Sequence, residues 1–320
     1  MIEFEAMFKR RLVLYFFTTG LFFLSLFFLV DKNQALAQDS VGLALSPPTF
    51  ELSANPGDFL KNTIRVENLT DRPMIIVVEK RNFTAMGEEG SVDLTENATP
   101  FSLASWITVD PVEVEIGPKG RSIFNFAINV PLNAEPGGHF GSIIFRVGNK
   151  EKVVGTGATL SQELGSLILL RIAGKADEEG QFASFKAIKK FFEYGPVDFE
   201  IRVRNDGNVH LKPTGSIIIN NFWGKKVATI EVEPKNVLPG AIRKLSATWE
   251  RKFLLGRYRA IVSLNYGTER KILVSSTSFV GFPYKIGGII ILGLLVLTIF
   301  IFRARKRLKL ALKVLLGRYH

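Results

Sequence analysis

One uninterrupted apolar run near the C-terminus constrains the fold of this chain more than any other feature. Residues 286–302 contain no charged side chain, and residues 303–320 contain seven Lys or Arg and no Asp or Glu. A helix of this length rises about 25 Å, at the short end of what spans a bilayer. Short basic segments stay in the cytoplasm. The pattern therefore predicts a transmembrane helix, 286–302, with a basic cytoplasmic tail, 303–320, and the body of the chain outside.

The N-terminus fits the same topology. Three basic residues at positions 9–11 precede an apolar stretch, 12–30, and small residues stand at Ala35 and Ala37. This arrangement is typical of a secretory signal, so residues 1–37 are predicted to be a signal peptide cleaved before Gln38. The long apolar stretch leaves an uncleaved anchor as the alternative. Both outcomes place the body of the chain outside the cell.

The positive charge of the chain belongs mainly to its ends. The formal net charge is +11, but residues 38–284 contain 29 Lys or Arg and 27 Asp or Glu. The body is therefore close to neutral, and the basic excess indicates membrane topology. We expect no nucleic-acid partner.

The chain contains no cysteine. Disulfides, thiol nucleophiles and thiolate metal sites are therefore excluded, and the exported body must be stabilised by apolar cores alone. Its length is sufficient for two ordinary domains, each with a core of its own.

Short β-branched and aromatic runs, separated by turn residues, predict an all-β body. Examples are 62–68, 122–130 and 141–147. Within the second of these, residues 123–128 alternate less cleanly, which predicts a strand covered on both faces. Many short strands at this spacing favour two tandem immunoglobulin-like β-sandwiches, which we place at the two ranges 38–176 and 177–280.

Three short segments recur in the same order in both halves, which supports two domains of one architecture. The paired segments are 64–68 with 201–205, 116–121 with 237–243, and 138–144 with 256–262.

The run from Val41 to Pro73 resembles the first domain of the WxL-interacting cell-surface proteins, a family of Gram-positive-type bacteria, and 191–213 resembles the second domain of that family. The layout of signal peptide, two sandwiches, membrane helix and basic tail is also similar. The resemblance implies a non-enzymatic adhesion or scaffold role. It further implies a first domain that binds peptidoglycan and a second that binds other surface proteins or host ligands. Sandwich domains of this kind are also similar to those of pilus chaperones.

The polar segment from Phe83 to Ser102 is predicted to be the longest loop of the first domain. Long loops on rigid sandwiches are common binding sites, although a disordered insertion is the equal alternative. If a glycan binds there, Asn82, Glu88, Asp93 and Trp106 are the candidate ligand-binding residues, since they supply hydrogen bonds and a stacking face.

No catalytic, metal or cofactor motif is present. His139, His210 and His320 stand far apart in the sequence, and their spacing does not suit a metal cluster. Hydrolase, Walker and metalloprotease signatures are absent, so we expect neither an enzyme nor a cofactor. All three tryptophans are interpreted as core or edge aromatics.

The tail after the membrane helix is predicted to be a basic helix, for which a plain stop-transfer role is favoured and association with the inner leaflet is the other interpretation. Its candidate membrane-surface residues are Arg303, Arg305, Lys306, Arg307, Lys309 and Lys313.

The leading hypothesis is a single-pass surface protein with the lipid bilayer, cell-wall glycan such as peptidoglycan, and other exported proteins as partners. The alternative is a membrane-tethered assembly chaperone that acts by adding a strand at an open sheet edge. A membrane-bound hydrolase is the third and weakest.

Overall fold

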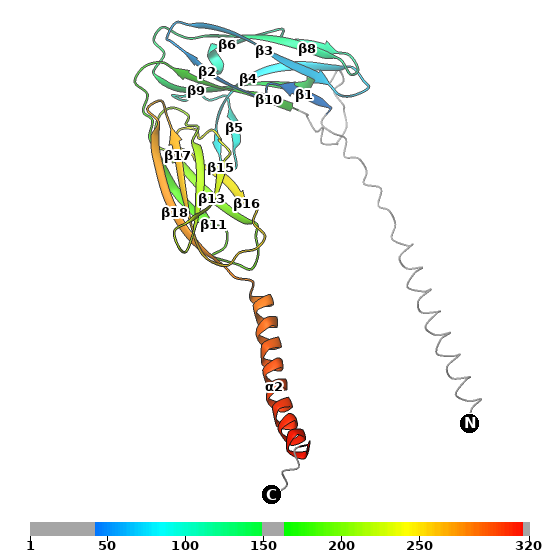
Figure 1. The fold of residues 1–320 in the computed structure, drawn as a ribbon. Helices are drawn as coiled ribbons and strands as arrows, with labels where there is room; N and C mark the ends of the chain where they lie inside the picture. Colours follow the sequence, from blue (N-terminus) through cyan, green and yellow to red (C-terminus); the bar gives the residue numbers. More distant parts are fainter. Residues whose placement is uncertain (1–41, 149–162, 316–320) are drawn as a thin grey trace, which may run out of the picture. The chain divides into compact units, whose positions relative to one another are not determined.

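The computed structural model describes residues 42–148 and 163–315, with side chains up to residue 305 (Figure 1). It contains two β-sandwiches in sequence, followed by one long helix. The predicted fold class is therefore confirmed. The predicted signal peptide, residues 1–37, lies outside the described residues.

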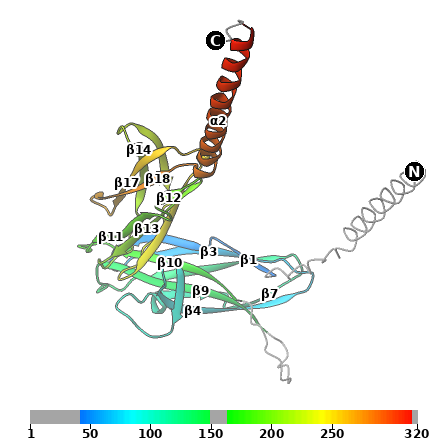
Figure 2. The ribbon, with the colours of Figure 1, turned by 90° about the horizontal axis from the view of Figure 1, so that it is seen from below.

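The first sandwich consists of two sheets, whose layers are visible in Figures 1 and 2. The four-stranded sheet has the order β1 (Leu43–Ser46), β3 (Phe59–Asn68), β8 (Arg121–Asn129), β6 (Ile107–Asp110). The six-stranded sheet has the order β2 (Thr49–Ala54), β10 (Glu163–Ile172), β9 (Gly137–Gly148), β4 (Met74–Met86), β5 (Ser91–Thr95), and β7 (Glu113–Ile116) also pairs with β4. A 3₁₀ turn, η1 (Ala104–Trp106), precedes β6.

The second sandwich also consists of two sheets. The three-stranded sheet has the order β11 (Gly180–Ala187), β13 (Val197–Asn205), β16 (Ile242–Trp249). The five-stranded sheet has the order β12 (Phe191–Phe192), β18 (Lys271–Gly281), β17 (Gly256–Tyr266), β14 (Thr214–Asn221), β15 (Lys226–Val232).

In both sandwiches the first stretch of chain crosses from one sheet to the other. In the first sandwich, β1 pairs antiparallel with β3, and β2 then pairs parallel with β10 of the opposite sheet. In the second, β11 pairs antiparallel with β13, and β12 then pairs parallel with β18. The two domains therefore share one architecture.

Each sandwich has its own apolar core. In β13 the alternating residues Val197, Phe199, Ile201 and Val203 are buried, as the period-two pattern of a half-buried strand requires. Because each sandwich fills its interior with its own side chains, neither needs a disulfide to be compact.

The predicted two-sided burial of residues 123–128 is wrong. In β8, Phe124, Phe126 and Ile128 are buried, while Ile123 is 55% exposed, so the strand buries one face only. The strand covered on both faces is β9, whose first nine residues are all buried. It lies in the middle of the six-stranded sheet, whose outer face carries further apolar side chains.

The repeated segments of the sequence occupy equivalent places in the two folds. Asn68 ends β3 and Asn205 ends β13, and both side chains are fully buried. The Nδ2 of Asn68 donates to the carbonyl of Gly117 at 3.0 Å, and the Nδ2 of Asn205 donates to that of Val237 at 2.8 Å. The first repeated segment therefore binds the second in each domain.

The C-terminal helix, α2 (Tyr284–Leu315), begins three residues after β18. Within it, Tyr284–Arg305 is long and apolar enough to cross a membrane, with a mean hydropathy of 2.6. This segment contains the predicted span, 286–302.

Candidate functional site

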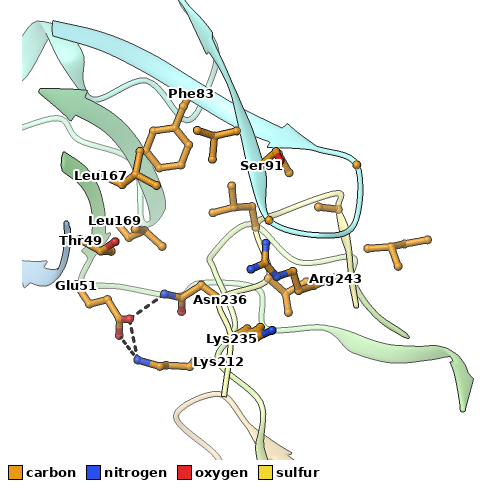
Figure 3. Close-up of a pocket in the computed structure, with 18 of the residues that line it drawn as sticks. Thr49, Glu51, Phe83, Ser91, Leu167, Leu169, Lys212, Lys235, Asn236 and Arg243 are labelled. Atoms are coloured by element: carbon orange, nitrogen blue, oxygen red, sulfur yellow. Dashed lines mark hydrogen bonds and ion pairs between the residues drawn. The ribbon is translucent and has the colours of Figure 1, made fainter. Parts of the chain in front are cut away.

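A cavity of about 320 Å³ lies between the outer face of the six-stranded sheet and a loop region of the second sandwich (Figure 3). Both sandwiches contribute side chains to it. From the first come Thr49, Glu51, Phe83, Ser91, Val92, Leu167 and Leu169, and from the second come Lys212, Lys235, Asn236, Leu238 and Arg243.

The floor of the cavity is apolar because β10 is covered on both sides. Ile168 and Leu170 point into the core of the first sandwich, so the intervening Leu167 and Leu169 face outward. There they join a small apolar cluster with Phe83, to which the second sandwich adds Leu238. The cavity therefore offers apolar contact to a ligand.

One wall of the cavity is polar but charge-balanced. The carboxylate of Glu51 accepts hydrogen bonds from the Nζ of Lys212 at 2.7 Å and from the Nδ2 of Asn236 at 2.8 Å. Burial raises the pKa of Glu51, but the hydrogen bonds from these two partners outweigh it and leave the pKa below its ordinary value. Glu51 is therefore ionised at neutral pH and neutralises Lys212.

Arg243 supplies an unbalanced cation. Among the described residues, no carboxylate forms an ion pair with it, and its buried Nε has no hydrogen-bond partner. Its guanidinium lies against Gly90, where a Cβ would overlap it. Figure 3 shows it between the hairpin that carries Ser91 and the loop that carries Asn236. An anionic group that reached the cavity would find an arginine without a competing carboxylate.

The segment predicted to be the long loop of the first domain, 83–102, is largely a β-hairpin, so that prediction is wrong. β4 continues to Met86 and pairs antiparallel with β5, so that Asn82 lies opposite Thr95 and Met86 lies opposite Ser91. The hairpin tip contacts the second sandwich, where Glu88 binds Arg202 and Glu89 accepts from Lys244 at 3.0 Å. The pKa of Glu88 lies below its ordinary value because Arg202 donates to its carboxylate. The hairpin therefore forms a wall of the cavity.

The edge of β10 is only half covered. The N–H groups of Leu167 and Ala173 donate to the carbonyls of Pro48 and Ala54, which places the odd-numbered amides of β10 on the β2 side. β2 begins opposite Leu167. In the part of the chain that the structure describes, no strand pairs with the earlier residues, 163–166, on that side. Among the described residues, no strand uses the outward amides of Glu163 and Gly165, and beside them the Oγ of Ser166 donates to the carbonyl of Pro47 at 2.9 Å. This stretch is next to Leu167, which lines the cavity.

The four predicted glycan-binding residues do not converge on this cavity. Asn82 is buried, and its Oδ1 accepts from the backbone amides of Leu103 and Ala104. Trp106 packs on His139 with ring centroids 4.4 Å apart, Glu88 is at the hairpin tip, and Asp93 lies in β5. Glycan binding by these residues stays a prediction.

The predicted membrane-surface residues all belong to α2. Arg303 and Arg305 are exposed, whereas the side chains of Lys306, Arg307, Lys309 and Lys313 lie outside the described side chains. Among the described residues, no three His, Asp or Glu are close enough to hold a metal ion.

Arg243 and Glu51 were not predicted from the sequence as site residues. Arg243 ends the second repeated segment, and the matching position of the first domain is Arg121. That recurrence was a usable signal for Arg243. Glu51 carries no such signal, because its partners Lys212 and Asn236 are far from it in the sequence.

A histidine beside the cavity makes stability dependent on pH. Burial lowers the pKa of His210 to about 4, with Glu51 raising it and Arg171 and Lys212 lowering it further. Since the ordinary value is 6.5, the unfolded chain binds this proton first, and stability is lost as pH falls below 6.5.

From pH 7 to pH 5 we expect a loss of about 2 kcal/mol in the free energy of unfolding from this group. The measurement is urea denaturation of the wild type and of His210→Gln at both pH values. The variant should show a smaller loss, and equal losses in the two proteins would contradict this assignment.

No family model matches the chain, and no curated protein matches it. The resemblance to the WxL-interacting proteins therefore stays a prediction.

Among solved structures, similar chains include bacterial fimbrial chaperones. The class 5 fimbrial chaperone CfaA has a TM-score of 0.39 and 13% identity, over 74% of this chain and 99% of that chain. CupB2 of Pseudomonas aeruginosa has a TM-score of 0.34 and 11% identity, over 74% of this chain and 100% of that chain. The Escherichia coli chaperone DraB has a TM-score of 0.34 and 15% identity, over 73% and 95%. All three TM-scores and identities are low.

Proposed function

We propose that α2 anchors the chain in a membrane and that the two sandwiches lie outside the cytoplasm. The apolar segment Tyr284–Arg305 supports the anchor, and the basic residues that follow it support a cytoplasmic C-terminus. A body without cysteines, closed by two separate cores, is compatible with export in either oxidising or reducing surroundings.

We further propose that the body binds an extended segment of another exported protein by strand addition. The observation that carries this proposal is the stretch of β10 that no described strand pairs on its β2 side, next to a cavity whose lining includes Arg243 without an ion-pair partner among the described residues. A polypeptide laid along residues 163–166 would pair with the outward backbone groups of Glu163 and Gly165. Because β2 occupies the edge from Leu167 onward, the next residues of that polypeptide would pass over the outer face of the sheet, where Leu167 and Leu169 form the apolar floor.

The chemistry of the cavity selects among such segments. The floor suits alternating apolar side chains, and Arg243 suits a carboxylate, because its guanidinium is not neutralised by a described carboxylate. The preferred ligand is therefore an extended, apolar segment that carries an acidic group. A polypeptide fits better than cell-wall glycan, since a sheet edge recognises peptide groups.

The test uses the full chain in lipid nanodiscs and labelled synthetic peptides of about eight residues, a typical strand length, with alternating valines. One peptide ends in aspartate, and the other ends in lysine with its carboxyl group amidated. We expect the acidic peptide to bind more tightly. Arg243→Ala should weaken its binding about tenfold or more, because a charge-assisted contact is lost.

Two matched controls separate the causes. Arg259→Ala removes an exposed arginine of β17 that lies outside the cavity and should leave binding unchanged. Glu163→Pro removes one outward amide at the first position of β10, whereas Glu163→Gln keeps it and loses only the 3.6 Å ion pair with Arg146. Of these two Glu163 variants, we expect only Glu163→Pro to bind the peptide more weakly. If neither Arg243→Ala nor Glu163→Pro changes peptide binding, strand addition at β10 is rejected.

A further inference from the structure

One end of the second sandwich collects the segments that adjoin α2. In register, Gly256 pairs with Gly281 and Asn221 with Tyr258, so the turn after β14 and the start of β17 lie at the end where β18 stops. Val197 pairs with Trp249, which adds the loop after β16, and β12 pairs with the last residues of β18. In Figure 1 the chain passes from this end of β18 into α2. We call it the helix-proximal end.

The helix-proximal end exposes many large apolar side chains. Trp223, in the turn after β14, is 76% exposed, and its ring centroid lies 3.6 Å from that of Phe222. Further exposed large apolar residues here are Ile188, Phe191, Tyr194, Phe253, Leu255, Val280, Phe282 and Tyr284. At the opposite end, the turn between β17 and β18 is polar, with Thr268, Glu269 and Arg270. Clustered exposure of this kind marks a surface that contacts another phase or molecule.

The same end is rich in exposed cations. These are Lys189, Lys190, Lys225, Lys226, Arg251, Lys252, Arg257 and Lys285. The acidic residues near them are Asp198, Glu193 and Glu250, and Glu193 already accepts an ion pair from Lys285 at 3.0 Å. Exposed aromatics mixed with Lys and Arg suit a lipid headgroup layer, in which rings sit among the headgroups and cations face phosphates.

The connection to α2 is too short to let this end leave the bilayer surface. From Gly281 to Tyr284 the chain makes three peptide steps, which span at most about 11 Å. The headgroup region is roughly 5–8 Å thick on each side of the hydrocarbon. The ring of Tyr284 also lies 6.2 Å from that of Phe191 in β12, so the first turn of the helix contacts the sandwich.

We propose that the helix-proximal end is a membrane-docking surface, on which Trp223, Phe253 and Leu255 enter the headgroup layer of the bilayer that α2 crosses. This inference rests on the proposed membrane anchor and is independent of peptide binding at β10. The occupant is the lipid surface, because the surface is continuous with α2 and its positive charge complements anionic phosphates. The second sandwich therefore contacts the membrane surface and does not move freely about its connection to α2.

The test places the full chain in vesicles of phosphatidylcholine and phosphatidylglycerol that carry a nitroxide quencher either on the headgroup or deep in the acyl chains. The wild type contains Trp106, Trp223 and Trp249. We expect the headgroup label to quench part of the tryptophan emission, and Trp223→Phe to remove that part. The deep label should quench Trp223 less. Failure of the headgroup label to quench Trp223 overturns the proposal.

A pair of matched double variants tests the neighbouring side chains. Phe253→Ser with Leu255→Ser should reduce the headgroup quenching of Trp223. Ile272→Ser with Val274→Ser removes two equally exposed apolar side chains along β18, away from this end, and should leave the quenching unchanged. Equal effects of the two double variants would contradict docking through the helix-proximal end.

Carbonate extraction of the same vesicles keeps the two proposals apart. If the wild-type chain is released by alkaline carbonate, α2 does not anchor it, and the proposed anchor fails. If the chain stays in the vesicles and Trp223 is not quenched, only the docking surface fails.

Discussion

Replacing Glu178 by alanine should lower the free energy of unfolding by about 3 kcal/mol, because it removes one partner of a largely buried ion pair. The Glu178 side chain is 5% exposed and accepts from Arg171 at 2.5 Å and from the amide of Thr268 at 2.8 Å. Arg171 belongs to β10 of the first sandwich, and Thr268 lies in the turn between β17 and β18 of the second. Loss of these contacts would therefore destabilise both the connection between β10 and β11 and the second sandwich.

The measurement is urea denaturation of the full chain in detergent micelles, followed by tryptophan emission. Glu179→Ala is the matched control, since Glu179 is exposed and only its backbone carbonyl is used, by the amide of Asp206. A surface change of this kind should cost less than about 0.5 kcal/mol. Equal destabilisation by the two alanine variants would show that the Glu178 contacts do not stabilise the fold.

The same carboxylate has a defined pH dependence. Burial raises the pKa of Glu178, but hydrogen bonds from Arg171 and Thr268 more than offset this and leave the pKa below its ordinary value. A depressed pKa means that the stabilisation is present above the ordinary value of 4.5 and is lost as pH falls through the folded pKa. The Glu178 effect therefore begins below pH 4.5, near the lower end of the range from 6.5 to about 4 in which His210 acts.

The overall fold was predictable because its determinants are local. Alternation of apolar residues within each strand determines which face is buried, and turn residues determine where a strand ends. The three repeated segments also correspond to equivalent structural positions in the two sandwiches. Two of them, ending at Asn68 and beginning at Ile116, contact each other through hydrogen bonds, and the third lies in β9 and β17 at equivalent places.

The candidate site was not predictable in the same way, because its members meet only through tertiary packing. Glu51 and Asn236 are 185 positions apart, and nothing near either residue indicates the other. The 83–102 segment looked like a loop because its tip is polar, but that tip is used for ion pairs to Arg202 and Lys244. Two-sided burial of β9 likewise depends on neighbours that lie outside its own sequence pattern.

The sequence alone also did not distinguish the buried tryptophan of the second sandwich from the exposed one. Trp249 is buried in the core of the second sandwich, as a packing aromatic should be. Trp223 was interpreted in the same way from the sequence, but it lies in a turn and its side chain is largely exposed. Only strand register places it beside the start of α2, and this placement makes it a candidate for contact with lipid.

Asn205→Ala should destabilise the second sandwich by about 3 kcal/mol, because the buried Val209 carbonyl and Gly207 amide would lose the side chain that they bind, and the Val237 carbonyl would keep only the Leu211 amide. Its Nδ2 donates to the carbonyls of Val209 and Val237, each at 2.8 Å, and its Oδ1 accepts from the amide of Gly207 at 2.9 Å. Asn265→Ala, in the exposed part of β17, is the control and should cost less than about 0.5 kcal/mol.

The equivalent substitution Asn68→Ala tests whether this residue acts within its own domain. Asn68 makes the same kind of contacts to the carbonyls of Arg72, Ile116 and Gly117 in the first sandwich. Hydrogen exchange followed by mass spectrometry should show faster exchange in β3 and β8 for Asn68→Ala, and in β13 and β16 for Asn205→Ala. If each substitution instead accelerates exchange equally in both sandwiches, the two cores unfold as one unit, and the buried asparagines are not independent ties within their domains.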